Sequence, residues 1–291
     1  MYSHGFTKSR LAAVGAVACL AATVAACGSA SSGGSSTGNS AASVSPKQAV
    51  LLAATSAAKV NTFSGTFNLQ GTVKEAGASG PINVAGTVSG QLHPSLMVSE
   101  NFGTFSAGGE NLGPTGIVFT TKDAYLKMAG ITQALHTSKP WIELPISAIS
   151  AKSGLNFSSL MSQMQNSSPL ASIQMLAGAS DVKNLGQSSV GGVPVTEYSG
   201  VLTMTKAIDA LPADTRAALQ QETAAAGIKT SSFKVWLDSG NQARKAVIVE
   251  KGSTVSETIT VTMTSMNQPV NISAPPASQV TSVPASVLSG S

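Results

Sequence analysis

The sequence predicts an α+β fold in which a large, curved antiparallel sheet carries helices packed on its concave face. Segments whose apolar residues recur with a period of two, as in strands with one buried face, occur in the first and last thirds of the chain. Segments with helical spacing lie between them. A curved sheet has to bury its concave face, and helices are the natural cover for it.

The first 26 residues follow the plan of a bacterial signal peptide. Lys8 and Arg10 precede an uncharged, mostly apolar stretch that ends at Ala26. Residues 24–27, Val-Ala-Ala-Cys, resemble the lipobox of bacterial lipoproteins. This resemblance implies that Cys27 receives a diacylglycerol and becomes the first residue of the mature protein. We therefore interpret residues 1–26 as a lipoprotein signal peptide.

Two other interpretations of this segment are an ordinary secretory cleavage site after one of the alanines and an uncleaved transmembrane anchor. The uncharged stretch of about 16 residues is short for a span, since a helix needs roughly 20 to cross the hydrocarbon core. The lipoprotein interpretation predicts that lipid on Cys27 holds the protein at the extracytoplasmic face of the cell membrane. Two or three acyl chains anchor a protein durably, whereas one does so only marginally.

Composition excludes some classes of partner and of cross-link. Cys19, the only other cysteine, lies within the predicted signal peptide, so the mature chain is expected to form no internal disulfide. The formal net charge of +4 includes the two basic residues of that peptide. No stripe of Lys and Arg with interleaved aromatic residues is present, and we expect no nucleic-acid partner.

Four segments are expected along the chain. After the signal peptide, residues 27–45 are the lipidated cysteine and a flexible linker of Gly, Ser, Ala, Thr and Asn, which has too little apolar surface to order itself. Residues 46–267 are expected to form one α+β domain. Residues 268–291, rich in Pro and Ser, are expected to form a poorly ordered tail.

Within the domain, the periodicity predicts these elements. Helices are expected at 46–59, 158–165, 169–178 and 206–226, the last one broken at Pro212. The Gly-rich stretch 103–116 is expected to be a loop or a wide bend, and Gly191-Gly192 a tight turn. Strands are expected at 63–73, 82–92, 96–102, 117–121, 124–128, 141–144, 182–190, 194–204, 231–237, 243–251 and 254–265.

This order of elements resembles that of the mycobacterial LppX/LprG-type lipoproteins. The local likeness is greatest in residues 141–145, 170–186, 193–200 and 233–238, and the resemblance spans residues 46–266. It implies a half-open barrel, similar to bacterial lipoprotein carriers of the Lol type, with a cavity for the acyl chains of lipids or lipoglycans. These stretches are structural and contain no catalytic signature.

A carrier of this kind needs a deep apolar cavity. Two acyl chains of about 16 carbons expose some 30 methylenes, each of which gains about 0.8 kcal/mol on burial. Methionine suits a ligand of variable shape because it adapts to irregular packing. Each of the methionines is nevertheless more easily explained as filling of the core between helix and sheet. The candidate lipid-binding residues are Phe67, Leu69, Val84, Val88, Met128, Met161, Met164, Ile173 and Met175.

The sequence offers little sign of catalysis. His93 and His136 stand alone, which is a poor signal for a metal site. Residues 34–38 match the Gly-x-Ser-x-Gly pattern but lie in the linker, with no strand before and no helix after them. Trp141 and Trp236 could stack on sugar, although a strand tryptophan is more often core. We expect no cofactor, no metal and no paired catalytic carboxylates.

Three hypotheses follow for the function. The first is a non-catalytic envelope protein that binds or carries acylated lipids or lipoglycans. The second is a structural or protein-interaction lipoprotein whose core is filled by its own side chains and whose partner is unknown. An enzyme is the third. A large apolar cavity favours the first, a solid core the second, and a convergent cluster of titratable groups the third.

Overall fold

The structure is a computed structural model, and the residues that it describes are 44–75, 78–107, 110–146, 169–209, 211 and 213–283. The predicted signal peptide, Cys27, nearly all of the linker and the predicted helix 158–165 with Met161 and Met164 lie outside these residues. Within the described residues, 13 strands form a single sheet. The predicted α+β class, with a large and mostly antiparallel sheet, is confirmed.

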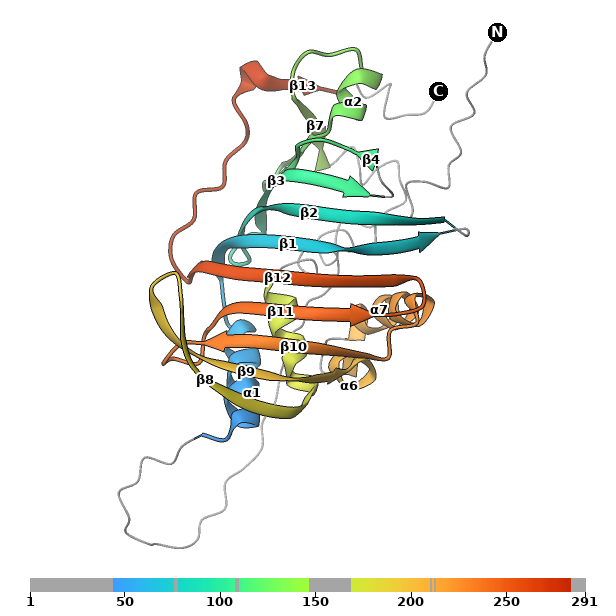
Figure 1. The fold of residues 1–291 in the computed structure, drawn as a ribbon. Coiled ribbons are helices and arrows are strands. Elements are labelled where there is room, and N and C mark those ends of the chain that lie inside the picture. The colour runs from blue at the N-terminus through green and yellow to red at the C-terminus, as the bar shows by residue number, and fades with distance from the viewer. Residues whose placement is uncertain are drawn as a thin grey trace, which may run out of the picture.

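The sheet has two halves that meet in the middle (Figure 1). The order is β13-β7-β6-β5-β3-β2-β1-β12-β11-β10-β9-β8, with β4 paired to β3, so the sheet is open and ends at β13 and β8. Only the β13–β7 pair, among those described, is parallel. The first half contains β1 (Thr62–Glu75), β2 (Ala78–Gln91), β3 (Met97–Ala107), β4 (Glu110–Asn111), β5 (Thr115–Phe119), β6 (Asp123–Lys127) and β7 (Trp141–Pro145). The second contains β8 (Ala179–Val190), β9 (Val193–Thr203), β10 (Thr230–Leu237), β11 (Ala243–Lys251) and β12 (Val255–Met266), and β13 is Val280–Ser282.

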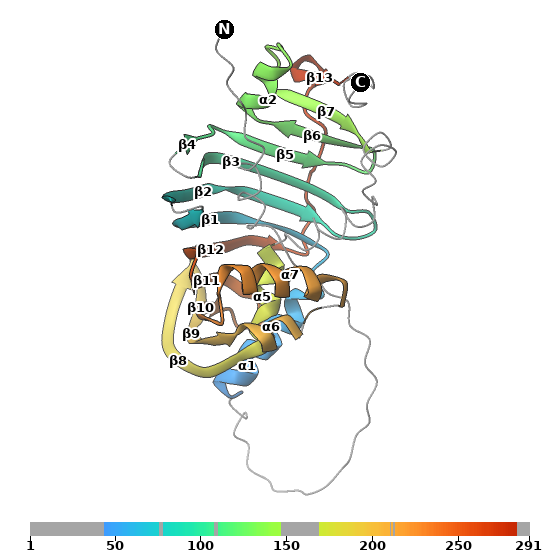
Figure 2. The ribbon, with the colours of Figure 1, turned by 90° about the vertical axis from the view of Figure 1, so that its right-hand side faces the viewer.

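The helices gather on one face of the second half (Figure 2). They are α1 (Pro46–Ala57), α5 (Pro169–Gln174) with the 3₁₀ turn η2 (Met175–Gly178), α6 (Met204–Asp209) and α7 (Ala213–Ala226). The short helix α2 (Ala129–Ala134) lies at the far edge of the first half. The helix-covered side is the concave face of the sheet, and the opposite side is here called the outer face. The predicted cover of helices is therefore present over β8–β12.

Helix α1 shows how the local sequence positions this cover. The Ser45 hydroxyl accepts a hydrogen bond from the Gln48 amide at 3.2 Å and caps the helix. Pro46 occupies the first helical position, where no amide hydrogen is needed. Small apolar side chains at helical spacing form its buried side, namely Ala49, Val50, Ala53, Ala54 and Ala57. Because these side chains are short, α1 can lie close to its neighbours.

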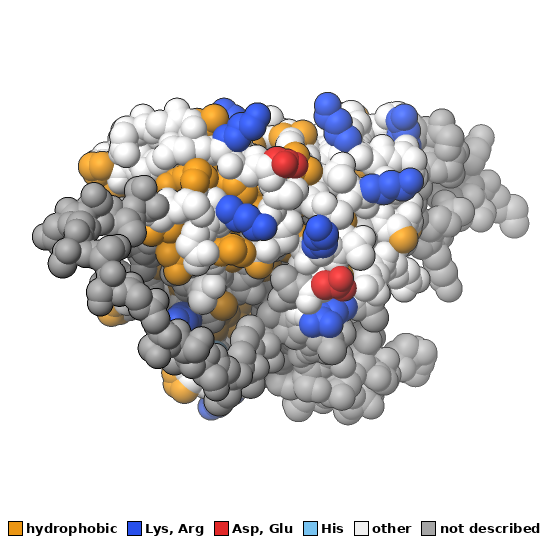
Figure 3. Space-filling view, turned by 90° about the horizontal axis from the view of Figure 1, so that it is seen from below, with side chains coloured by type: hydrophobic (Ala, Val, Ile, Leu, Met, Phe, Trp, Pro, Cys, Tyr) orange, Lys and Arg blue, Asp and Glu red, His pale blue; other side chains and the backbone are white. Residues whose placement is uncertain are grey.

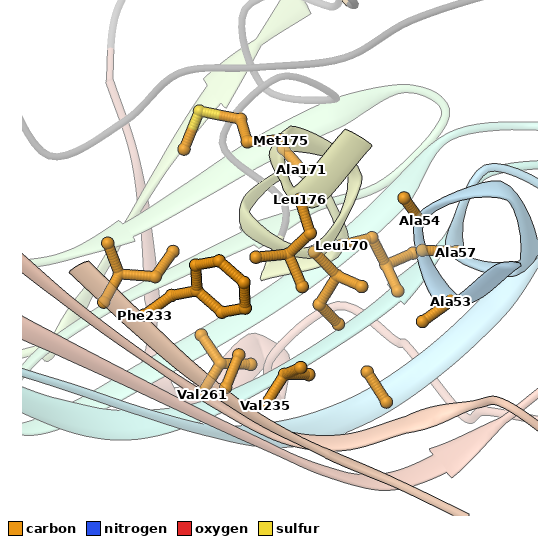
Figure 4. Close-up of a cluster of buried hydrophobic side chains, with 14 of the residues drawn as sticks. Ala53, Ala54, Ala57, Leu170, Ala171, Met175, Leu176, Phe233, Val235 and Val261 are labelled. Carbon is orange, nitrogen blue, oxygen red and sulfur yellow. The ribbon is translucent and has the colours of Figure 1, made fainter. Parts of the chain in front are cut away.

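The helix-covered half has a densely filled core (Figure 4). Leu170 and Leu176 of the α5 region face Phe233 and Val235 of β10, with α1 beside them. All four side chains are at most 3% exposed. A void between α1, α5 and the strands has a volume of only about 10 Å³. Such a space holds no more than one water molecule.

Two expectations about irregular segments were wrong. Residues 103–107 continue β3 instead of opening a loop, because Gly103 is the extra residue of a bulge: Thr104 pairs with Ala85 while Phe102 pairs with Gly86. The second concerns the expected tail, of which residues 268–283 are ordered. Ile272 packs on Val118 and Tyr125 at the outer face, and β13 pairs with β7. Alternating apolar residues in this Pro-rich stretch supply the contact.

Candidate functional site

The candidate site is the concave face of β1, β2 and β3, beyond the helix-covered core. Phe63 of β1 and Val88 of β2 belong to that core. Phe67 and Leu69 share the parity of Phe63, so their side chains lie on the same concave face. A further apolar cluster lies there, and we call it the β1–β3 face. It consists of Leu69, Ile82 and Val84 with the partly buried Phe67, Val73, Phe102, Phe105 and Ile259.

Three phenylalanine rings follow one another across this face. Gly86 of β2 stands opposite both Phe67 of β1 and Phe102 of β3. Because Gly86 has no side chain, the Phe67 and Phe102 rings meet above it, with centroids 6.4 Å apart and an interplanar angle of 72°. The bulge at Gly103 returns Phe105 to the same face, 6.3 Å from the Phe102 ring. The rings are only partly buried, as expected of residues that line a binding surface.

The predicted lipid-binding residues separate into distinct environments. Phe67, Leu69 and Val84 come together on the β1–β3 face. Val88, Ile173 and Met175 instead belong to the helix-covered core, and Ile173 is only 1% exposed. Met128 immediately precedes α2, at the edge of the sheet. Met161 and Met164 lie outside the described residues.

Two polar side chains interrupt the apolar concave face next to the phenylalanines. Glu100 of β3 stands opposite Val88, and Thr115 of β5 stands opposite Phe102. The Thr115 side chain is buried, and its hydroxyl has no hydrogen-bond partner. Burial raises the pKa of the Glu100 carboxyl from 4.5 to about 7. The concave face around Glu100 therefore combines an apolar surface with a titratable group, as functional sites often do.

Sequence reasoning missed Phe102, Phe105, Glu100 and Thr115. Phe102 and Phe105 are three residues apart, which breaks the period of two unless Gly103 is recognised as a bulge. Glu100 shares its parity with Val98 and Phe102, so a charge at an inward position was visible in the sequence. Thr115 lies within the stretch that was expected to be a loop.

A second hollow lies on the outer face of β8–β11, with a volume of about 510 Å³. Lys183, Ser199 and Lys234 follow one another across three strands there, above Val201 and Val249. The Lys234 ammonium lies 2.9 Å from the Glu197 carboxylate, which offsets part of the positive charge. Viewed from below, this end of the molecule carries more basic than acidic side chains (Figure 3).

A metal centre and a membrane-crossing helix are not found in the parts of the chain that the structure describes. No group of three or more His, Cys, Asp or Glu side chains is placed there to hold a metal ion. None of the helices in the described ranges is both long and apolar enough to cross a membrane.

Comparison with known proteins gives one relative in sequence and several similar folds. No protein-family model matches the chain. It is 31% identical over 177 residues to a Streptomyces griseus protein described as an uncharacterized 31.2 kDa protein in the rplA-rplJ intergenic region. The match covers 59% of this chain and 57% of that protein, so the chain spans little more than half of its curated relative.

The similar solved structures include mycobacterial lipoproteins. LprF from Mycobacterium bovis is 12% identical with a TM-score of 0.47, over 79% of this chain and 96% of LprF. The lipoprotein LppX from Mycobacterium tuberculosis is 14% identical with a TM-score of 0.44, over 80% of this chain and all of LppX. LppX belongs to the group of lipoproteins whose order of elements the sequence resembles.

Proposed function

We propose that the protein is a lipid-anchored envelope lipoprotein that binds or carries acylated lipids or lipoglycans without catalysis, and that the acyl chains lie on the β1–β3 face. The observation that carries this proposal is the run of Phe67, Phe102 and Phe105 beside the buried Leu69 and Val84. These side chains form one apolar surface on the concave side of an open sheet.

The physical chemistry of acyl chains supports this surface as the site. Each methylene that the face covers gains about 0.8 kcal/mol, so ten covered methylenes give about 8 kcal/mol before the cost of ordering the ligand. Partly buried rings still have apolar area to lose to a ligand. In the helix-covered half, Ile173 and Met175 have almost no exposed apolar area for a ligand to cover, because neighbouring side chains already surround them.

The sequence supports the anchor. The amino terminus has the pattern of a lipoprotein signal. It consists of a basic start, an uncharged stretch and Val-Ala-Ala-Cys at residues 24–27. A random coil as long as the stretch between Cys27 and Pro46 would span roughly 5 to 6 Å times the square root of the number of residues, or about 25 Å. The ligand-binding part would thus remain close to the membrane from which it takes lipid.

Native mass spectrometry with organic extraction tests the proposal. The full chain is expressed in the envelope of a related host and released with its anchor. We expect acyl lipid at near-stoichiometric occupancy in addition to the lipid on Cys27. The Phe102→Ala variant is expected to lower that occupancy, whereas Phe233→Ala, a matched change in the helix-covered core, lowers stability but leaves the occupancy of folded protein unchanged. Protein that is consistently empty, and stays empty when lipid is offered, contradicts a carrier.

The second candidate is a protein-interaction lipoprotein without a lipid cavity. The filled core beneath α1 and α5, with its void of about 10 Å³, favours it for that half of the molecule. The same experiment separates the two functions. Empty wild-type protein that retains its fold favours the interaction module, and bound lipid that depends on Phe102 favours the carrier.

A further inference from the structure

Glu100 and Thr115 are close to each other on the concave face. Glu100 stands opposite Ile117, and Phe102 stands opposite Thr115. Residues two apart on a strand point to the same side, so Glu100 and Thr115 are diagonal neighbours on adjacent strands. Diagonal neighbours of this kind are about 7 to 8 Å apart, and their Cβ atoms are somewhat closer. Phe102 lies directly beside both, which connects this polar pair to the β1–β3 face.

Thr115 is a buried hydroxyl that still requires a partner. Its side chain is 5% exposed, and its Oγ1 atom makes no hydrogen bond. Leaving a buried polar group unpaired costs about 1 to 3 kcal/mol, and most buried polar groups in native proteins are paired. A threonine hydroxyl can both donate and accept. A valine would fit the same space without this cost, so the hydroxyl is informative about what occupies the neighbouring space.

Glu100 adds a titratable group to the same place. It lies among Val88, Phe102 and Ile117, with burial as the cause of its pKa near 7. At neutral pH a substantial fraction of this carboxyl is protonated and can donate a hydrogen bond. An anionic group of a ligand placed beside it would be repelled whenever Glu100 is ionised, whereas a neutral oxygen would not.

We propose that Glu100 and Thr115 are the polar end of the ligand site and hydrogen-bond neutral oxygens of an acylated ligand, namely the ester carbonyl and hydroxyl groups where the acyl chains are joined. The chains then run from Phe102 towards Phe67 and Leu69. This inference rests on the proposed lipid-binding function and adds the class of ligand to it. Pure hydrocarbon leaves the buried Thr115 hydroxyl unpaired and is disfavoured.

The test compares two probes that differ only in the carbonyl groups. Dipalmitoylglycerol carries two ester carbonyls, and dihexadecylglycerol carries ether oxygens on chains of the same length. Affinity of the full, delipidated chain for each is measured by fluorescence displacement. Wild-type protein is expected to prefer the ester by on the order of tenfold, the ratio that corresponds to one hydrogen bond of about 1.4 kcal/mol.

Variants assign this preference to the proposed residues. Thr115→Val has nearly the same shape and removes only the hydroxyl, so it is expected to fold normally and to bring the ester-to-ether ratio near one. Thr87→Val is the matched control, because Thr87 is exposed and has the parity of the outer face. Glu100→Leu is expected to lower the ratio as well, with little effect on the affinity for the ether probe.

The outcomes separate the two levels of the proposal. If wild-type protein binds neither probe, the lipid-binding function itself fails. If it binds both equally and Thr115→Val changes nothing, the function stands and the polar end is wrong. If the ester-to-ether affinity ratio falls to near one in Thr115→Val protein and stays at the wild-type value in Thr87→Val protein, the result supports the proposed site.

Discussion

Replacing Glu100 by glutamine should make the stability of the protein less dependent on pH. The carboxyl has a pKa of about 7 in the folded protein and 4.5 as the ordinary value. Below pH 4.5 both states are protonated, so folding has no charge to bury. Between pH 4.5 and 7 the Glu100 carboxyl is ionised in the unfolded chain but still protonated in the folded protein, so the free energy of unfolding falls. Above pH 7 the carboxyl is ionised in the folded protein too, which then carries the full free-energy cost of burying the charge. At 1.36 kcal/mol per pKa unit this cost is about 3 kcal/mol.

Urea denaturation at pH 4.5 and pH 8 measures the effect. Glu100→Gln is expected to exceed the wild-type free energy of unfolding by less than about 0.5 kcal/mol at pH 4.5 and by up to about 3 kcal/mol at pH 8. The buried Glu250, whose pKa is also raised mainly by burial, is common to both proteins and cancels in the comparison. Asp209→Asn, which neutralises an exposed carboxylate, is the control and should show no such difference. Equal pH dependence in wild-type and Glu100→Gln protein would refute the burial of this charge.

Three further perturbations probe other parts of the structure. Asp238→Ala removes an ion pair with Arg244 at 2.7 Å and two amide hydrogen bonds within the turn, so it should lower the free energy of unfolding by about 2 kcal/mol in urea titrations. The pKa of Tyr125 is raised to about 12, first by burial and then by the hydrogen bond to Glu143. Glu143→Gln should therefore lower the pKa of Tyr125 yet leave it above 10. The pKa is measured by tyrosinate absorbance, and Tyr125→Phe protein gives the contribution of the other tyrosines, which is subtracted. Ile272→Ala should cost about 3 kcal/mol in the same denaturation assay, and a change below about 0.5 kcal/mol would mean that the carboxyl-terminal segment adds nothing to the fold.

Much of the fold follows from local periodicity. Regular alternation in residues 231–237, 243–251 and 254–265 predicts strands that coincide closely with β10, β11 and β12. The helical stretch broken at Pro212 becomes α6 and α7, and Gly191 and Gly192 both have positive φ in the turn between β8 and β9. These features depend on neighbours in the sequence, which is why a single sequence suffices for them.

Features that depend on distant residues were not predictable in the same way. The pairing of β1 with β12 joins residues about 190 positions apart, such as Phe67 and Val261, and no local pattern specifies it. The packing of residues 268–283 is decided by the outer face of β5 and β6, far earlier in the chain. Three candidate residues, Phe67, Leu69 and Val84, were found because their alternation is regular. Phe105 was missed because a bulge shifts the period.

The place of β12 in the sheet has a consequence for how the molecule is made. It is the strand that connects the two halves, with β1 on one side and β11 on the other, yet it is nearly the last element of the chain. Until residue 266 has emerged, β1 and β11 both present unpaired backbone edges, which are templates for aggregation. A chain that closes such a distant contact folds slowly. Nascent protein of this architecture is therefore open to edge-to-edge association at β1 and β11, and carboxyl-terminal truncation before β12 should yield two disconnected half-sheets.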